Sequence, residues 1–212
     1  MAKSTDIQVL LVRSGHTEWD DAGRLQGETD LPLSDSGRTA VRAVIDALGA
    51  EPPGQVVSSG DEAAAETARI LAERSGVSRP RTIDEFTDVD LGLWEGLLES
   101  ELTDRYTKAW GQWRESPDAV TPPEGESIED AEARIIIALC KALEKAGKAP
   151  TAVVLRPIAY AIVRRRLAER PPADLRAILD DEAPFERFTL TRDRLKSLLS
   201  EARASLKTPA AR

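Results

Sequence analysis

The fold of this 212-residue chain is decided by the stretch LLVRSGHTEW at residues 10–19, which leads into GRLQG at residues 23–27. The apolar run at residues 7–12 is typical of a buried strand. It ends abruptly in the polar segment RSGH at residues 13–16. Because α/β proteins place their chemistry at the carboxyl ends of strands, we expect the active-site corner at this segment.

The rest of the chain alternates strand-like and helix-like segments. Short apolar runs bounded by turn residues predict strands, and amphipathic or alanine-rich stretches predict helices. The expected strands are 55–59, 151–155 and 187–191, with a brief extended piece at 81–86, and the expected helices include 34–48, 62–74, 127–147 and about 157–170. This alternation favours a layered α/β fold with a mostly parallel sheet.

A polar helix is expected in the segment 97–127. It carries Tyr106, Trp110 and Trp113 at spacings of four and three, so the three rings share one face. We expect this segment to form a helical cap on the side of the site, with its rings packed between the cap and the sheet. No internal repeat or long linker divides the chain, so a single domain over residues 1–212 is predicted.

Composition restricts the classes of partner. A net charge of -8 and a pI near 4.9 argue against a surface built for nucleic acid or for an anionic membrane. The single cysteine, Cys140, lies in an apolar run, which predicts a buried thiol, no disulfide and no cysteine-based metal site. No apolar segment approaches the ~20 residues that span a bilayer, and no apolar signal core precedes the first strand. We therefore expect a cytoplasmic protein that uses no metal and no cofactor.

Five ordered segments resemble the histidine phosphatase superfamily, the phosphoglycerate mutase-like fold. In that family the first strand ends Arg-His-Gly and continues Glu-Thr-x-Trp-Asn, whereas residues 13–20 read RSGHTEWD, with Ser14 at the position of the nucleophilic histidine. The further matching segments are SSGDEAAAETA at 58–68, DVDLGLWEG at 88–96, PPEGES at 122–127 and VVLRP at 153–157. An ordered set of segments is far more specific than one motif. The resemblance implies an α/β three-layer sandwich, with a mostly parallel central sheet flanked by helices.

The reaction that the resemblance implies is phosphoryl transfer through a phosphohistidine. It needs an imidazole nucleophile, cationic donors around the phosphate oxygens, and an acid that protonates the leaving oxygen. Arg13 matches the family's first phosphate-binding arginine, and Asp88 takes the place of its acid/base glutamate. The nucleophile position holds Ser14, the second arginine is replaced by Ala63, and the second histidine by Arg156. A hydroxyl without an adjacent base is a poor nucleophile, so the family's reaction cannot run unchanged.

The sequence leaves open whether the altered pocket holds an anion. Arg156 restores a permanent positive charge, and a guanidinium fork suits phosphate, sulfate or carboxylate. The alternative is that Arg156 pairs with Asp88 or Asp20 and fills the space of a ligand. Asp20 replaces an asparagine of the family, and its carboxylate repels an anion. The anion-binding candidates are Arg13, Arg156 and Arg24, with His16, Asp20 and Gln26 at the rim.

Two further residues have both a functional and a structural interpretation. Arg24 is either another anion donor or an exposed loop arginine in a solvated ion pair. His16, the only histidine, projects to the same side as Ser14 if the strand continues, and with Asp88 as the orienting carboxylate it would activate that hydroxyl. The structural alternative for His16 is a partly exposed residue of a loop that turns away from the site.

The sequence thus predicts a catalytically degenerate histidine phosphatase-like protein, a pseudoenzyme that keeps a weak phosphate- or anion-binding pocket. One alternative is a residual or rewired phosphomonoesterase that uses Ser14 and His16. Another is a protein-interaction scaffold with an empty pocket. The expected ligand is a small phosphorylated or other anionic molecule, and neither nucleic acid nor a membrane is an expected partner. A protein partner or a homodimer is left open.

Overall fold

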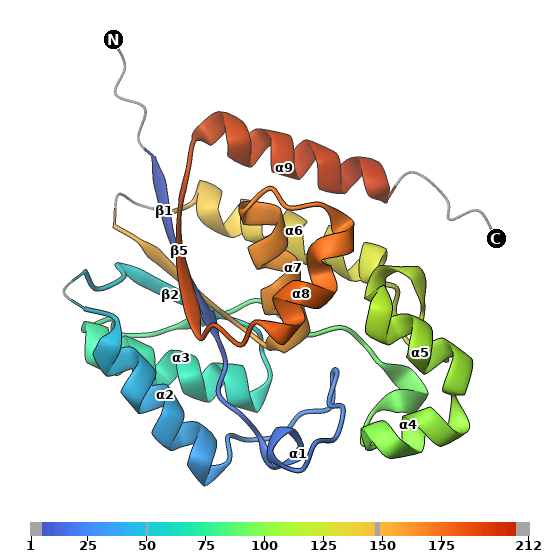
Figure 1. The fold of residues 1–212 in the computed structure, drawn as a ribbon. Coiled ribbons are helices and arrows are strands. Elements are labelled where there is room, and N and C mark those ends of the chain that lie inside the picture. Colours follow the sequence, from blue (N-terminus) through green and yellow to red (C-terminus); the bar gives the residue numbers. More distant parts are fainter. Residues whose placement is uncertain (1–5, 50, 147–148, 207–212) are drawn as a thin grey trace.

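The computed structural model describes residues 6–49, 51–146 and 149–206, which form a central sheet between two layers of helices (Figure 1). The strands are β1 (Ile7–Arg13), β2 (Gln55–Ser58), β3 (Arg81–Thr82), β4 (Thr151–Leu155) and β5 (Phe185–Leu190). Their order across the sheet is β3-β2-β4-β1-β5. All neighbouring pairs are parallel except β1 with β5, which is antiparallel. The predicted α/β fold with a mostly parallel sheet is confirmed.

The helices divide between the two faces of the sheet. Two helices cover one face, namely α2 (Asp35–Ala47) and α3 (Glu62–Ser75), and four cover the other, namely α6 (Ile128–Glu144), α7 (Pro157–Leu167), α8 (Leu175–Asp180) and α9 (Arg192–Ser205) (Figure 1). The short helices α1 (Glu18–Asp21), α4 (Glu99–Arg105) and α5 (Thr107–Glu115) lie toward the carboxyl end of β1. Single 3-10 turns are η1 (Asp84–Phe86), η2 (Gly92–Trp94), η3 (Pro117–Ala119) and η4 (Pro172–Asp174).

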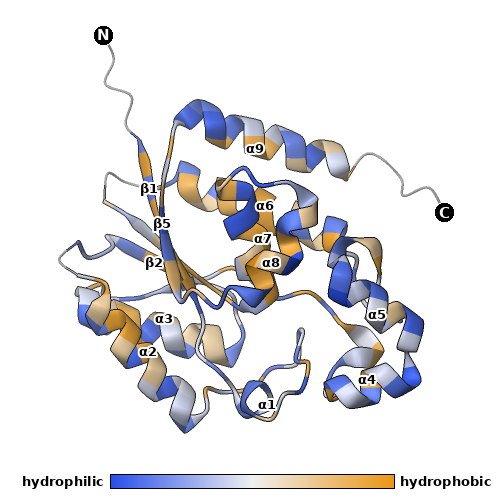
Figure 2. Ribbon diagram, in the orientation of Figure 1, coloured by the Kyte–Doolittle hydropathy of each residue, from blue (hydrophilic) through white to orange (hydrophobic). Residues whose placement is uncertain are grey.

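Successive residues of β1 feed two separate hydrophobic cores. Val9 and Leu11 pack in the core beneath α6, α7 and α9, whereas Leu10 and Val12 pack in the core beneath α2 and α3. This division follows from the strand geometry, in which neighbouring side chains point to opposite faces. Figure 2 shows the hydrophobic faces of α2, α6 and α7 turned toward the sheet. Burial on both sides holds the carboxyl end of β1 in place.

Side-chain caps fix where the long helices begin. The Ser34 hydroxyl accepts from the Gly37 N–H at 3.0 Å, Asp61 accepts from Ala64 at 2.9 Å, and Ser127 accepts from Asp130 at 3.1 Å. Each bond satisfies an N–H that the first helical turn leaves without a partner. The helix beginnings predicted at Ser34 and Ser127 are confirmed. The end predicted for the latter helix, Gly147, lies outside the described residues.

The predicted polar helix is two helices, because the chain breaks at Tyr106. This residue has φ -127° and ψ 33°, which lies outside helical geometry and separates α4 from α5. The break lets three rings surround Trp94, with centroid distances of 6.0 Å to Tyr106, 5.7 Å to Trp110 and 5.5 Å to Trp113. Tilted and edge-on contacts of this kind add to the stability of the buried cluster. The rings are therefore part of the core.

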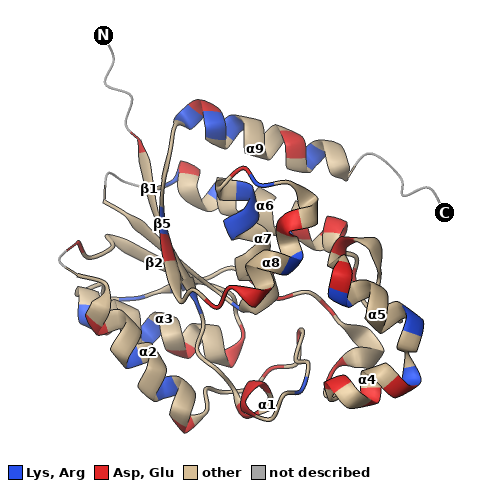
Figure 3. Cartoon of the chain, in the orientation of Figure 1, with Lys and Arg blue, Asp and Glu red and all other residues tan. Residues whose placement is uncertain are grey.

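Charged residues of both signs are mixed on the helix surfaces (Figure 3), and the single cysteine lies in the core. Figure 3 shows acidic and basic residues interspersed along α2, α4 and α9. Cys140 is fully buried, and this burial raises the pKa of its thiol to about 12, as expected for an inert core cysteine. Among the residues that the structure describes, no helix is both long and apolar enough to cross a membrane.

Candidate active site

The carboxyl ends of β1 and β4 create the candidate site. The two strands are parallel, and Arg13 lies beside Leu155 in the sheet. The Ser14 N–H donates to the Leu155 carbonyl at 2.8 Å, and Arg156 follows directly as the N-cap of α7. Ser14 and Arg156, which are 142 positions apart in the sequence, thereby become neighbours.

A cleft of about 400 Å³ opens beyond these strand ends. Ser14 and Ala63, at two of the altered catalytic positions, are buried and do not line it. The other predicted site residues all line the cleft, namely Arg13, His16, Asp20, Arg24, Gln26, Asp88 and Arg156. Within the described residues, His, Cys, Asp and Glu side chains form no group of three or more that could hold a metal ion.

Gly15 allows the end of β1 to pack closely against α2 and α3. Its N–H donates to the Thr67 hydroxyl at 3.1 Å, which ties the strand end to α3. A Cβ at this position would lie 2.6 Å from a methyl carbon of Val41 and 2.8 Å from one of Leu33. Only glycine allows such an approach, so the direction in which the chain leaves β1 is fixed by packing.

Arg156 occupies the centre of the altered site. Its side chain is 3% exposed. Nη1 donates to the Ser14 hydroxyl at 3.4 Å and to the Gly15 carbonyl at 3.3 Å. Nη2 donates to Gln26 Oε1 at 2.5 Å and lies 3.2 Å from Asp20 Oδ2. Of the two pairings that the sequence leaves open, the structure contains the one with Asp20.

Asp20 and Gln26 are themselves held by local bonds. Asp20 Oδ2 accepts from the Thr17 N–H at 2.8 Å and from the Thr17 hydroxyl at 3.0 Å, which caps α1. Gln26 Oε1 also accepts from Thr17, at 2.6 Å, and its Nε2 donates to the Thr29 carbonyl at 2.7 Å. The acceptors around Arg156 are therefore preorganised, and they neutralise its charge without a ligand.

Asp88 is a buried carboxylate at the beginning of α7. Its oxygens accept from the Ala159 N–H at 2.6 Å and from the Ile158 N–H at 3.3 Å, where the helix dipole favours negative charge. Burial nevertheless raises the pKa of Asp88 to about 6, against the opposing effect of Arg156 and of the backbone donors. Asp88 thus has the proton affinity of a general acid near neutral pH.

The loop that carries Asp88 is tied to α6 by Arg134, which the sequence analysis missed. Arg134 donates to the backbone carbonyls of Thr87 and Asp88, both at 2.7 Å, and pairs with Glu126 at 2.7 Å. Its partners at residues 87 and 88 are 47 and 46 positions away. No motif marks such a residue. The only available signal was Glu126, which lies in the PPEGES segment.

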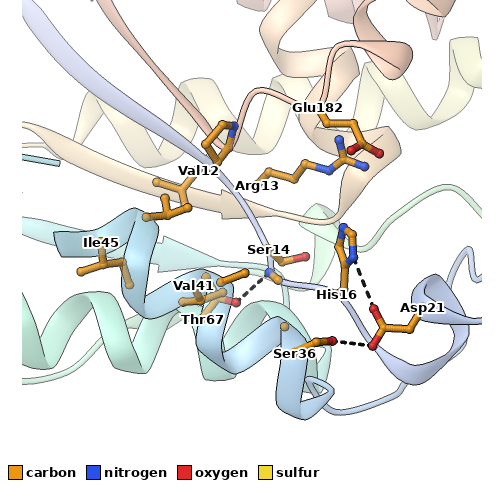
Figure 4. A pocket seen from close by; sticks show the side chains of 15 residues that line it. Val12, Arg13, Ser14, His16, Asp21, Ser36, Val41, Ile45, Thr67 and Glu182 are labelled. Atoms are coloured by element: carbon orange, nitrogen blue, oxygen red, sulfur yellow. Dashed lines mark hydrogen bonds and ion pairs between the residues drawn. The ribbon is translucent and has the colours of Figure 1, made fainter. Parts of the chain in front are cut away.

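Ser14 and His16 are committed to different partners. Ser14 is buried and accepts from Arg156, whereas the His16 side chain is 48% exposed and its Nδ1 lies 3.5 Å from Asp21 Oδ1 (Figure 4). Within the described part of the chain, no hydrogen bond joins Ser14 to His16 or to Asp88. The structure therefore does not assemble the Ser14–His16–Asp88 arrangement, and His16 is the partly exposed loop residue of the structural alternative.

The two remaining arginines, Arg24 and Arg13, differ in the hydrogen bonds that their side chains make. Arg24 Nη1 donates to the Gly96 carbonyl at 2.5 Å and lies 3.8 Å from a Glu101 oxygen, so Arg24 is in the solvated ion pair of the structural alternative. Arg13 is half-buried, and its Nε has no hydrogen-bond partner among the described residues. Arg156 Nε also lacks a partner among the described residues, but Arg156 is buried, so Arg13 is the more accessible of the two.

Comparisons with known proteins agree on one family. The sequence model of the histidine phosphatase superfamily (branch 1) matches residues 9–202. Phosphoserine phosphatase 1 of Hydrogenobacter thermophilus is 29% identical over 61% of this chain and 61% of its own length. Glucosyl-3-phosphoglycerate phosphatase of Mycobacterium tuberculosis is 35% identical over 60% of this chain and 56% of its own length. The chain thus spans less than two thirds of either relative.

The structural comparison gives the same result. A mycobacterial glucosyl-3-phosphoglycerate phosphatase, solved as a complex with VO3, superimposes with a TM-score of 0.74 at 28% identity. The superposition covers 81% of this chain and 86% of that one. The similarity therefore includes the helical layers as well as the sheet.

Proposed function

The chain belongs to the histidine phosphatase superfamily, and from that premise we propose that it is a pseudoenzyme that has lost phosphoryl transfer and keeps a weak pocket for small anions. Because the relatives are named as phosphatases, the proposed loss of activity is a departure from the family. Support for this departure comes from the substitutions at residues 14, 63 and 156 and from the contacts of the residues now there.

The observation that carries the proposal is the contact between Arg156 and Ser14. A guanidinium is a donor only, so it directs an N–H at the hydroxyl oxygen and cannot take the hydroxyl proton. A nucleophilic serine needs the opposite arrangement, in which a base accepts that proton. Asp88 accepts from two backbone N–H groups instead of from Ser14. Ser14 is therefore left without activation.

The anion pocket of this proposal rests mainly on Arg13. Arg156 contributes less, because an anion has to displace Asp20 and Gln26 from its Nη2. The carboxylates of Asp20 and Asp88 line the same cleft and repel a negatively charged ligand. The pocket accordingly favours weak binding of phosphate, sulfate or a small phosphorylated molecule.

Turnover assays test the loss of catalysis. Wild type should hydrolyse p-nitrophenyl phosphate and phosphoglycerates no faster than the Arg13→Ala variant, because neither protein has an activated nucleophile. Turnover that disappears in Ser14→Ala would contradict the proposal and favour a rewired phosphomonoesterase.

Titration calorimetry with inorganic phosphate tests the pocket. Asp20→Asn should strengthen binding about tenfold, because it frees Arg156 and removes one repelling charge, and Arg13→Ala should abolish binding. Asp46→Asn, at an exposed ion pair with Arg74 away from the cleft, is the matched control and should leave the affinity unchanged. Absence of binding in both wild type and Asp20→Asn at millimolar phosphate would instead favour a scaffold with an empty pocket.

A further inference from the structure

A second cavity, of about 230 Å³, lies beside the cleft between α2 and the end of β1 (Figure 4). Its walls are mostly apolar and include Val12 from the strand, Val41, Val44 and Ile45 from the helix, and Pro184 from the loop before β5. An apolar cavity of about 150 Å³ already accommodates benzene and does not fill with water. This cavity is therefore large enough for an aromatic ring or a branched chain with a short extension.

The charged side chains that line this apolar cavity lie together at one end of it (Figure 4). His16 and Asp21 pair with each other there, and the Ser36 hydroxyl donates to Asp21 at 2.6 Å. These hydrogen bonds lower the pKa of Asp21, so it stays an engaged carboxylate. Arg13 lines the same end, and its buried Nε has no partner among the described residues. The cavity thus presents one underused cation next to an apolar interior.

We propose that this cavity binds a small monocarboxylate with an apolar body, such as an arylacetate or a branched-chain acid. The carboxylate pairs with the guanidinium of Arg13, and the apolar body lies between α2 and β1. A planar carboxylate matches the guanidinium fork. A phosphate carries up to two negative charges, and Asp21 and Glu182 in the same lining disfavour the higher charge. The ligand is therefore a monoanion.

Glu182 competes with the carboxylate of a bound ligand for the Arg13 guanidinium. Figure 4 shows its carboxylate facing the Arg13 side chain from the loop before β5. Glu182 is exposed, and an exposed carboxylate pairs only weakly with a neighbouring guanidinium. A ligand whose body is buried in the cavity brings its own carboxylate to Arg13 and displaces Glu182 toward solvent. Removal of the Glu182 charge should then strengthen binding.

Ligand-observed NMR and calorimetry with phenylacetate test the proposal, with phenylacetamide as the uncharged control. Phenylacetate should bind at least tenfold more tightly than phenylacetamide, because only the acid pairs with Arg13. Glu182→Gln should tighten phenylacetate binding about threefold. Equal affinity for the acid and the amide, or no effect of Glu182→Gln, would overturn the assignment of Arg13 as the partner of the head group.

Cavity-filling variants test where the apolar body lies. Val44→Phe should abolish phenylacetate binding, because its ring enters the cavity from α2. Ala43→Phe places the same ring on the exposed face of the same helix and should bind as wild type does. Ala40→Phe supplies a second filling variant at the cavity rim if Val44→Phe does not fold. Undiminished binding by a folded filling variant would exclude this cavity.

The cavity proposal goes beyond the proposed function, although the cavity shares Arg13, His16 and Glu182 with the cleft. Asp20→Asn alters the cleft and not the cavity, so it should change phosphate affinity and leave phenylacetate affinity unchanged. Loss of phenylacetate binding alone rejects the cavity ligand, whereas turnover of phosphomonoesters alone rejects the pseudoenzyme.

Discussion

Arg156 and Asp20 replace a histidine and an asparagine of the family motifs, and in this structure the two replacements contact each other. Their side chains are 3% and 19% exposed, so the pair has little access to water. Breaking a buried pair leaves one charge uncompensated. The sequence shows that both positions have changed, but it does not show which carboxylate takes Arg156. That choice depends on distances between segments 136 positions apart.

Asp88 gives the fold a pH dependence at the scale of a single residue. Its pKa of about 6 in the folded protein exceeds the ordinary value of 3.8, so the folded state binds the proton more tightly than the unfolded chain. The resulting stabilisation is present at low pH and is lost as the pH rises through about 6. Between pH 5 and pH 8 the loss is on the order of 1 kcal/mol.

Urea unfolding of Asp88→Asn at pH 5 and pH 8 measures this contribution. The free energy of unfolding of the variant minus that of wild type should be larger at pH 8 than at pH 5, by on the order of 1 kcal/mol, because only wild type loses the contribution of Asp88 as the pH rises. Asp104→Asn adds an amide on the exposed face of α4 and is the control. The same difference at both pH values for Asp88→Asn would contradict a raised pKa at this carboxyl group.

At the scale of elements, Arg134 connects α6 to the loop before α7. Its guanidinium bonds to the carbonyls of Thr87 and Asp88 and to Glu126, so one side chain positions the backbone that presents the buried acid. Helix patterns locate α6 from the sequence because they depend on neighbouring residues. They do not reveal Arg134 or the break at Tyr106, because both features arise from contacts with distant segments.

Arg134→Gln should destabilise the protein by about 2–4 kcal/mol, because it leaves Glu126 and three backbone carbonyl groups without their donor. Chemical denaturation measures the loss, and amide hydrogen exchange should increase at residues 85–88 and at the beginning of α7. Arg114→Gln breaks an exposed pair with Glu99 and should cost less than about 0.5 kcal/mol. Equal effects of the two substitutions would show that Arg134 does not hold the loop.

At the scale of the molecule, the apolar run of β1 and the ordered segments were sufficient to predict the sheet, the helical layers and the edge where the site lies. Parallel strands bring their carboxyl ends to one edge whatever the loops do. The second cavity could not be predicted, because it forms where α2, β1 and the loop before β5 meet. Its volume depends on side-chain packing among these elements, which no local pattern records.

The conserved architecture predicts that catalysis can be rebuilt on this scaffold. Ser14→His, Ala63→Arg and Arg156→His restore the nucleophile and the phosphate ligands of the family motif, and Asp20→Asn removes the carboxylate that would lose Arg156. The four changes together should give measurable hydrolysis of p-nitrophenyl phosphate, whereas each alone should give none, because such groups act as a unit. Adding Arg13→Ala to the quadruple variant should abolish the gain.

An inactive quadruple variant that remains folded would show that the rest of the cleft has also diverged. The next substitution to test is then Asp88→Glu, which restores the longer side chain of the family motif. Activity of the quadruple variant after Asp88→Glu is added would show that the Asp88 side chain is too short to act as the acid.

The contact between Arg156 and Asp20 also affects how readily evolution could reverse these changes. Reverting Arg156 alone leaves the Asp20 carboxylate without its partner, and reverting Asp20 alone leaves the Arg156 guanidinium poorly compensated. Either single substitution should cost about 3–5 kcal/mol of stability, because it leaves one charge of the pair without its partner. A chain that carries both residues therefore passes through a destabilised intermediate on the way to the residues of the family motif, and substitutions at the surface do not remove that cost.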